Sequence, residues 1–229
     1  MEPFEDCRAV VFDLDGTLAD TIGDLATALN RTLAELVLPP HPEEAVRGMV
    51  GGGLAKLLER GLAAHGVLLD GAEREAVLAR FVAHYAANPA ERSTLYPGAR
   101  QTLNVLREAG IACGLCTNKH EPIARDLLDA LGIRSAFGAI QGSETGFPRK
   151  PDPACLIHVV KKLGASPETA LMVGDNATDL KTARAAGLKG VVLVSYGYSV
   201  TPVTELGADL VITHIHDLVP ALALPERAQ

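Results

Sequence analysis

The sequence predicts an α/β fold, in which a mainly parallel sheet is flanked by helices and carries an inserted all-helical domain. Short apolar runs alternate with amphipathic helical segments from residue 96 onward, and such alternation forms parallel sheets through right-handed crossovers. One further apolar run, residues 8–12, lies far upstream, and the segment between shows helical spacing. We therefore expect a discontinuous core, residues 1–18 and 93–229, and a helical cap domain, residues 19–92.

Composition restricts the class of protein. The chain has 229 residues, of which 48% are hydrophobic and 21% charged, as in a globular protein of one or two domains. No apolar run approaches the ~18 residues of a membrane span, so we expect no membrane partner. The N-terminus, residues 1–6, is acidic and lacks the parts of a signal peptide, which favours a cytoplasmic location. The net charge of −7 argues against a nucleic-acid partner, and a monomer or homodimer stays open.

The first strand leads directly into two carboxylates. β-Branched and aromatic residues run through 8–12 without a helical period, and they predict a short buried strand. Asp13 then sits at the carboxyl end of that strand, and Asp15 follows two residues later. This end of a strand is where open α/β sheets bind ligands. Gly16 frees the backbone to turn, and Thr17 adds a hydroxyl and an amide.

The predicted cap consists of helical segments separated by proline and glycine. Apolar residues at steps of three and four predict an amphipathic helix over 20–36. Shorter helical patterns cover 43–49, 54–64 and 72–87, and nothing from 20 to 90 shows a confident strand pattern.

The core segments after residue 96 follow a regular order. We expect strands over 111–116, 139–141, 171–173, 191–194 and 210–212, and helices over 99–109, 122–131, 153–163, 177–186 and 216–222. Cys113 and Cys116 show a C-x-x-C spacing, but residues three apart on a strand face opposite sides. We therefore expect buried structural thiols there, rather than a redox or metal site.

Polar residues follow the later strands and complete the opening pair of acids. Thr117 and Asn118 come after the second core strand, and a hydroxyl with backbone amides binds phosphate oxygens. Lys150 opens a helix and supplies a point charge for phosphate. Asp175 and Asp179 follow another strand, and carboxylates are hard oxygen ligands that suit Mg²⁺. Each stretch alone is commonly a helix cap or a solvated loop, but their combined order makes that explanation improbable.

Asp13-Leu14-Asp15-Gly16-Thr17-Leu18 resembles the signature loop of the haloacid dehalogenase superfamily, most of whose members are magnesium-dependent phosphatases. The later stretches follow in the same order, so the resemblance covers nearly the whole chain. It implies a Rossmann-like core with a mobile cap, a small phosphorylated metabolite as substrate, and Mg²⁺ as cofactor. It implies these roles: Asp13 as nucleophile, Asp15 as general acid and base, Thr117 as phosphate ligand, Lys150 as neutralising charge, Asp175 as metal ligand beside Asp13 and the backbone oxygen of Asp15, and Asp179 as support for the metal shell.

Several carboxylates and a phosphate in one crevice require a cation. Like charges 4 Å apart repel by about 4 kcal/mol at an effective dielectric of 20, and a phosphate monoester adds roughly two negative charges. Mg²⁺ and Lys150 would remove most of that repulsion. The remainder is expected to raise the pKa of one carboxylate, which suits a proton donor. Family members that are dehalogenases lack the second acid, because halide leaves without a proton, so Asp15 favours phosphoryl transfer.

A second, less specific similarity is to the bacterial phosphoglycolate phosphatases, and it implies hydrolysis of 2-phosphoglycolate. Gly51, Gly52 and Gly53 would present backbone N–H groups to the small anion, as helix starts commonly do, and Asn118 would join Thr117 in the phosphate site. An ordinary break between helices explains the glycines equally well. The similarity rests on residues 13–21, 49–53, 96–98, 117–119 and 195–198.

Alternative functions stay open at this point. One alternative is a phosphatase for another small phosphate, such as a sugar phosphate or pyrophosphate. Another is a sugar-phosphate mutase, which excludes water from the site. A catalytically silent binding domain is a third alternative, against which the complete set of acids with Lys150 speaks. Arg47 and Lys56 flank the glycines and are candidates for a substrate carboxylate, although solvated surface charge explains each alone.

Overall fold

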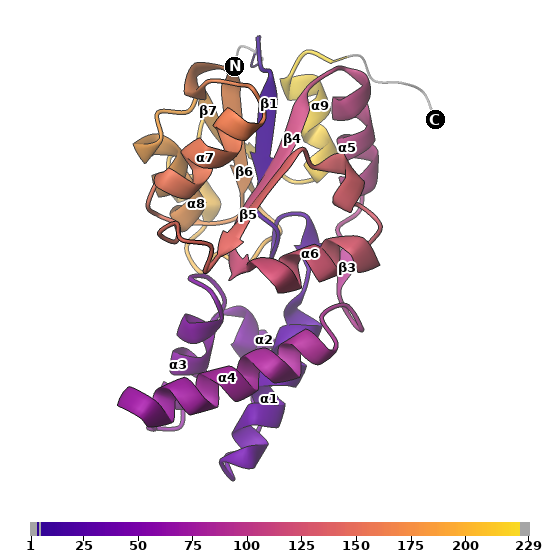
Figure 1. Cartoon of the computed structure of the whole chain (residues 1–229). Helices are drawn as coiled ribbons and strands as arrows, with labels where there is room; N and C mark the ends of the chain where they lie inside the picture. Colours follow the sequence, from indigo (N-terminus) through magenta and orange to yellow (C-terminus); the bar gives the residue numbers. More distant parts are fainter. Residues whose placement is uncertain (1–3, 5, 225–229) are drawn as a thin grey trace.

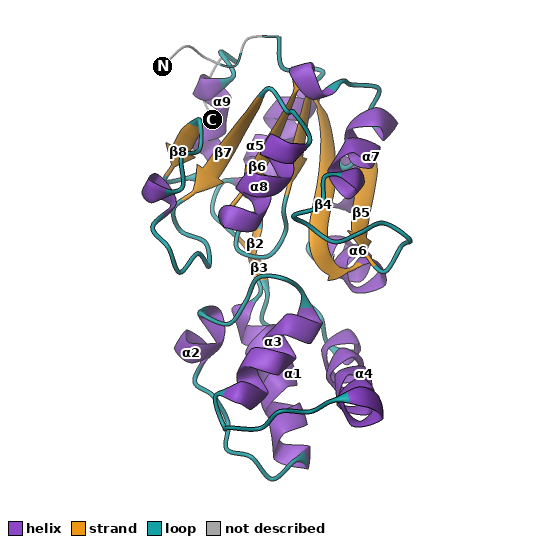
Figure 2. Cartoon of the chain, turned by 90° about the vertical axis from the view of Figure 1, so that its left-hand side faces the viewer, coloured by secondary structure: helices purple, strands orange, loops and turns teal. Residues whose placement is uncertain are grey.

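The structure is a computed structural model that describes residues 4 and 6–224. Most of the acidic N-terminus and the polar tail at 225–229 lie outside the described residues. Figures 1 and 2 show a sheet with helices on both faces, and a separate group of helices at the carboxyl ends of its strands. No helix within residues 4 and 6–224 is both long and apolar enough to cross a bilayer.

The predicted α/β fold with a parallel sheet is confirmed. The sheet contains β1 (Ala9–Phe12), β4 (Ala112–His120), β5 (Ala139–Ser143), β6 (Ala170–Gly174), β7 (Gly190–Val194) and β8 (Leu210–Ile212). Their order is β5-β4-β1-β6-β7-β8, and every neighbouring pair is parallel. The strand order reverses at β1, and this switch point is where open α/β sheets bind ligands. Asp13 therefore leaves the sheet at its central ligand-binding position.

Helices cover both faces of the sheet because β1 buries side chains in both directions. Val10 and Phe12 pack with α5 (Ala99–Glu108), α6 (Glu121–Ala130) and α9 (Leu218–Ala221). Ala9 and Val11 pack with α7 (Ala154–Lys162) and α8 (Ala177–Ala185) on the opposite face. A strand buried on both faces is uniformly apolar, and that explains the unbroken run Ala9–Phe12.

The two cysteines of the C-x-x-C spacing lie on opposite faces of β4, as predicted. Cys113 packs with the face that α5 and α6 cover, and Cys116 with the face that α7 covers. The nearest thiol to Cys116 is that of Cys155 on α7, with the two sulfur atoms 3.5 Å apart.

The remaining helices pack on each other. They are α1 (Ile22–Glu35), α2 (Glu43–Arg47), α3 (Leu54–Ala63) and α4 (Gly71–Ala87). Leu29, Leu33, Leu57, Phe81 and Tyr85 are among the side chains that form their common hydrophobic core. We use the word cap for residues 19–92, as the sequence predicts it.

Two short strands are absent from the sequence prediction, and one predicted strand is longer than expected. β2 (Ala19–Asp20) pairs antiparallel with β3 (Thr94–Leu95) where the chain enters and leaves the cap. Strands of two residues carry no readable periodicity, so the pattern missed them. β4 also continues to His120 with an irregular register after Cys116, so Thr117 and Asn118 belong to the strand rather than to a following loop.

Candidate active site

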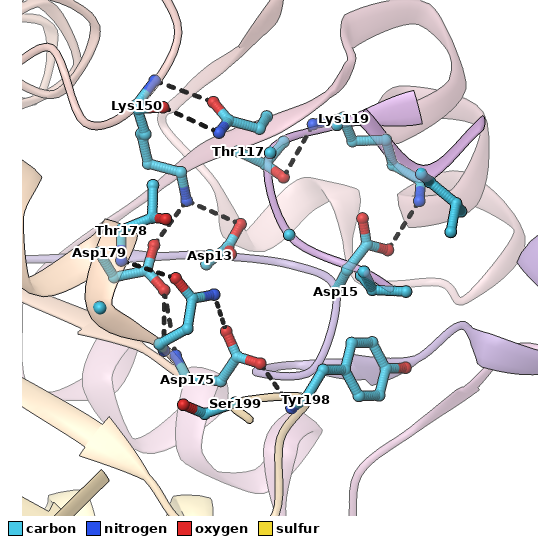
Figure 3. Close-up of a pocket in the computed structure, with 18 of the residues that line it drawn as sticks. Asp13, Asp15, Thr117, Lys119, Lys150, Asp175, Thr178, Asp179, Tyr198 and Ser199 are labelled. Atoms are coloured by element: carbon cyan, nitrogen blue, oxygen red, sulfur yellow. Dashed lines mark hydrogen bonds and ion pairs between the residues drawn. The ribbon is translucent and has the colours of Figure 1, made fainter. Parts of the chain in front are cut away.

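A cavity of about 250 Å³ lies where β1, β4 and β6 end and the cap begins. It brings together the predicted catalytic, metal and phosphate residues with the glycines of the cap: Asp13, Asp15, Thr117, Asn118, Lys150, Asp175, Asp179, Gly51, Gly52 and Gly53. Figure 3 shows Asp13, Lys150, Asp175 and Asp179 close together. Their roles stay predictions, but their convergence from five separate stretches of sequence is a property of the fold.

Lys150 joins two buried carboxylates. Its Nζ atom lies 3.0 Å from Asp13 Oδ1 and 2.7 Å from Asp179 Oδ1. The side chains are 2%, 10% and 0% exposed in the order Lys150, Asp13 and Asp179. Charges this deeply buried require partners, and here one ammonium group serves two carboxylates.

The crevice holds more negative than positive charge around Asp13. Burial raises the pKa of Asp13 to about 6; Lys150 opposes this shift, whereas the charges of Asp179 and Asp15 add to it. Burial also raises the pKa of Asp175, and the charges of Asp179 and Asp13 act in the same direction. A pKa raised by burial and by like charges means that a further cation would stabilise the ionised carboxylates.

Asp175, between β6 and α8, is held by one backbone donor and one side-chain donor. Its Oδ2 accepts a 2.7 Å hydrogen bond from the backbone N–H of Tyr198, and its Oδ1 accepts one from the side chain of Asn176. A Cβ atom at Gly16 or Gly197 would lie 2.4 or 2.6 Å from Asp175 Oδ2. These contacts are too short for any side chain, so both glycines are required for the carboxylate to sit there.

Three carboxylates form a group that suits a hard divalent cation. Oxygen atoms of Asp13, Asp175 and Asp179 lie within 4.8 Å of one another. Asp179 already uses Oδ1 for Lys150 and Oδ2 for the backbone N–H groups of Asp175 and Asn176. Asp175 accepts one hydrogen bond on each oxygen and pairs with no cation among the described residues, so Asp13 and Asp175 are better able to contribute ligands than Asp179, which supports them. An all-oxygen donor set of this kind fits Mg²⁺.

Asp15 points away from this group and has separate partners (Figure 3). Its Oδ1 accepts hydrogen bonds of 2.7 Å from both Lys119 Nζ and Thr21 Oγ1. Burial alone would lower the pKa of Lys119, but the Asp15 carboxylate raises it above its ordinary value, so this lysine is charged. The two acids of the opening pair therefore stand in different electrostatic surroundings.

Asn118 fixes the backbone of Lys150. Its Nδ2 donates to the Lys150 carbonyl at 3.0 Å, and its Oδ1 accepts from the Lys150 N–H at 2.9 Å. Thr117 lines the cavity and accepts a 3.3 Å hydrogen bond from the Lys119 N–H. β4 thus orients Lys150 from 32 residues away in the sequence.

The cap contributes glycines rather than the two cations that flank them. Gly51, Gly52 and Gly53 have φ of +106°, +96° and +87°, which only glycine adopts readily in succession. Neither Arg47 nor Lys56 is among the described residues that line the cavity. Arg47 lies 3.3 Å from Asp20, and Lys56 lies 2.7 Å from Glu59.

Several residues that line the cavity have no role in the sequence prediction, among them Lys119, Tyr198 and Arg60. Lys119 and Tyr198 lie in stretches that resemble phosphoglycolate phosphatases, but the sequence indicates no task for either, although the backbone N–H of Tyr198 holds Asp175. Arg60 of α3 donates to the carbonyls of Met49, Val50 and Gly51 and so fixes the glycine segment. Only the position of Lys119, two residues after Thr117, could have indicated it in advance, and no sequence signal marked Arg60.

The fold and the site define a class of protein. A family model for the haloacid dehalogenase-like hydrolases matches residues 7–187. The chain belongs to this family.

Similar proteins carry a more specific name. A protein from Rhodospirillum rubrum named phosphoglycolate phosphatase is 46% identical over 223 residues, covering 96% of this chain and 92% of its own. One of the same name from Caulobacter vibrioides is 43% identical over 212 residues, covering 93% and 89%. The crystal structure of a predicted phosphoglycolate phosphatase from Haemophilus somnus superposes with a TM-score of 0.87 at 30% identity, covering 94% and 97%. The chain is accordingly an enzyme, a phosphoric monoester hydrolase.

Proposed function

We propose that this phosphatase hydrolyses 2-phosphoglycolate to glycolate and phosphate. The observation that carries the proposal is the pairing of two acids with separate partners, Asp13 with Lys150 and Asp15 with Lys119, in one cavity. The cavity, about 250 Å³, is below the ~300–1,000 Å³ typical of sites for larger ligands, and this favours a small substrate. The relatives named above act, by their names, on phosphoglycolate.

In the first step Asp13 is the nucleophile. A carboxylate oxygen of Asp13 bonds to phosphorus while the bond from phosphorus to the substrate's alkoxide oxygen breaks. That oxygen takes the electron pair of the bond and a proton from Asp15, and it leaves as the hydroxyl of glycolate. Lys150 and the hydroxyl of Thr117 neutralise and orient the phosphoryl oxygens during the transfer.

In the second step Asp15 is the base. Its carboxylate takes a proton from water, and the water oxygen bonds to the phosphorus of the aspartyl phosphate. The bond between phosphorus and Asp13 breaks, inorganic phosphate leaves, and both acids return to their starting protonation states. One residue thus serves both transfers, because the proton it donates in the first step is recovered in the second.

Mg²⁺ is the cofactor that the donor set suits. Asp13, Asp175 and the backbone oxygen of Asp15 would hold it, and Asp179 would keep Asp175 in place through its N–H. When bound, it neutralises charge on the phosphate and on the carboxylates whose pKa values burial raises.

The glycines of the cap provide a site for the substrate carboxylate. Gly51–Gly53 precede α3, whose first backbone N–H groups carry partial positive charge. A Cβ atom at Gly53 would lie 2.9 Å from the carbonyl oxygen of Asn118, so the cap approaches the phosphate side of the cavity closely there. A small anion in which one CH2–O unit joins the carboxylate to the phosphate would span these two positions.

Steady-state assays test the proposal. We expect phosphate release from 2-phosphoglycolate with a kcat/KM at least about tenfold above that for other phosphomonoesters of a small panel, and loss of turnover with EDTA. A higher kcat/KM for a sugar phosphate or pyrophosphate would contradict the assigned substrate, and isomerisation without phosphate release would indicate a mutase. Turnover that is unchanged in EDTA would contradict the Mg²⁺ role.

The proposal includes the location, the oligomeric state and the partners of the enzyme. The enzyme acts in the cytoplasm as a monomer or homodimer, and its partner is a small phosphorylated metabolite rather than nucleic acid or a membrane. Size-exclusion chromatography with light scattering separates monomer from dimer.

A further inference from the structure

Lys119 is a buried cation that the reaction above does not use. Its side chain is 1% exposed, and lysine is almost never buried this completely unless its charge is paired. It extends from β4 toward the cap rather than toward the phosphate site that Lys150 serves (Figure 3). Its burial therefore calls for a specific partner and a specific task.

The partner is one oxygen of Asp15. Lys119 Nζ lies 2.7 Å from Asp15 Oδ1, and the Thr21 hydroxyl donates to the same atom at 2.7 Å. Within the described part of the chain, Asp15 Oδ2 receives no hydrogen bond from the protein. Two donors on Oδ1 fix the orientation of the carboxyl group and leave Oδ2 as the atom that can exchange a proton with substrate or water.

The cap holds the other side of Lys119. Its ammonium nitrogen lies 4.6 Å from the ring centroid of Tyr85, a residue of α4 that is 1% exposed. An aromatic face at this distance stabilises a desolvated cation. The Tyr85 hydroxyl has no hydrogen-bond partner within the described residues, so its ring, and not a hydrogen bond, is the contribution that the geometry supports.

We propose that Lys119 is a positioning residue for Asp15, and that Tyr85 of the cap holds Lys119 in the orientation this requires. The inference rests on the proposed function, because it assumes that Asp15 transfers the proton. It adds a link from the cap interior to the acid: Tyr85 on α4, Lys119 on β4, then Asp15 after β1. Lys119 itself touches no reacting atom.

Assays with two substrates of nearly equal size distinguish a role in positioning Asp15 from a general disturbance of the active site. In 2-phosphoglycolate the leaving group is an alkoxide that needs a proton, whereas in acetyl phosphate it is a carboxylate that needs none. The kcat/KM of each substrate reports phosphoryl transfer to Asp13. A loss specific to proton transfer therefore appears with 2-phosphoglycolate and is small with acetyl phosphate.

Lys119→Met shortens the unbranched side chain by one atom and removes its charge. We expect kcat/KM for 2-phosphoglycolate to fall by about 10–100-fold, as for other residues that orient a reacting group. The value for acetyl phosphate should stay within about threefold, which also shows that the variant is folded. Lys119→Gln repeats the test if the methionine variant does not fold.

Tyr85→Leu tests the link to the cap. We expect a smaller loss, about 3–10-fold with 2-phosphoglycolate, and no additional loss when it is combined with Lys119→Met, since the ring acts through Lys119. Phe81→Leu is the matched control, because it removes another buried ring of α4 that lies over no cation in the described structure.

The outcomes distinguish this inference from the proposed function. Equal losses with both substrates, or full activity of Lys119→Met with 2-phosphoglycolate, would overturn the positioning role. Additive losses in the double variant would overturn the link to Tyr85. If Asp15→Asn kept full activity, the assigned acid would be wrong, and if wild-type enzyme released no phosphate from 2-phosphoglycolate, the proposed substrate would be wrong.

Discussion

The crevice at the strand ends and the interior of the cap are both buried, but they bury opposite chemistry. In the crevice, Lys150 and Asp179 are 2% and 0% exposed and depend on each other's charge. In the cap, Leu29, Leu33 and Phe81 are 0% exposed and contact apolar neighbours. The cap thus lowers the free energy of the folded state through apolar burial, whereas the crevice concentrates charge at a cost to stability that its chemistry requires.

Asp13→Asn tests the crevice side of this comparison most strongly. We expect kcat to fall at least about 10⁴-fold, because the amide cannot replace the attacking carboxylate. Circular dichroism should show that the variant is folded. Full phosphatase activity in this variant would contradict the covalent mechanism.

Lys150→Met separates the effect of the lysine charge on stability from the effect of its side-chain packing. Methionine matches the volume but leaves Asp13 and Asp179 without their cation, so we expect the free energy of unfolding to fall by about 3–5 kcal/mol. Urea titration measures it, and phosphate release should fall as well. Lys162→Met, at an exposed lysine that ends α7, is the control and should change neither quantity. Equal effects of the two substitutions would mean that burial of the charge is unimportant.

Phe81→Ala is the corresponding change in the cap. Removing a side chain that is 0% exposed leaves a cavity, which typically costs about 3–5 kcal/mol. Leu68→Ala, at a residue that is 84% exposed, should cost less than about 0.5 kcal/mol. Urea unfolding compares them. If folded Phe81→Ala protein lost as much activity as Asp13→Asn, the cap interior would not differ from the crevice in the way described.

The two regions should also differ in their response to pH. The folded-state pKa of Asp13 is about 6, above its ordinary value of 3.8. The native state therefore binds more protons than the unfolded state between these values, and the contribution of Asp13 to stability falls as pH rises through this window. For metal-free protein in EDTA we expect about 1–3 kcal/mol less stability from this group at pH 7 than at pH 4.

Subtraction isolates that contribution, since other carboxyl groups, such as Asp209, have lowered pKa values and act in the opposite direction. The difference in unfolding free energy between wild type and Asp13→Asn should favour the variant increasingly as pH rises from 4 to 7. A difference that is independent of pH would contradict the raised pKa.

Lys56→Gln should have the smallest effect. Lys56 is about half exposed and pairs with Glu59 on the cap surface, and exposed pairs contribute little. We expect an unchanged unfolding midpoint and a kcat/KM within about twofold of wild type. A clear rise in KM for 2-phosphoglycolate would instead indicate that this lysine reaches the substrate carboxylate.

The sequence predicted the features that depend on neighbouring residues, such as buried strands and the polar residues that follow them. The apolar run Ala9–Phe12 indicates a strand that is buried on both faces. Asp13 and Asp175 are polar residues that directly follow a strand, and this position predicts that they belong to the site. The sequence was silent on contacts between distant residues. Nothing in the sequence near Lys119 indicates that Asp15, 104 residues away, is its partner. Likewise, nothing near Asn118 indicates that its side chain binds the backbone of Lys150. Such pairs arise from the packing of the whole sheet and cap.

The β2–β3 ribbon has a consequence for how genes of this kind diversify. Ala19 pairs with Leu95 and Asp20 with Thr94, so the polypeptide enters and leaves the cap side by side. An insertion whose ends meet at one place does not strain the host sheet, and such positions tolerate replacement of whole segments. Exchange of the coding segment between these two positions would therefore replace the complete cap in one event and leave Asp13, Lys150 and Asp175 unchanged.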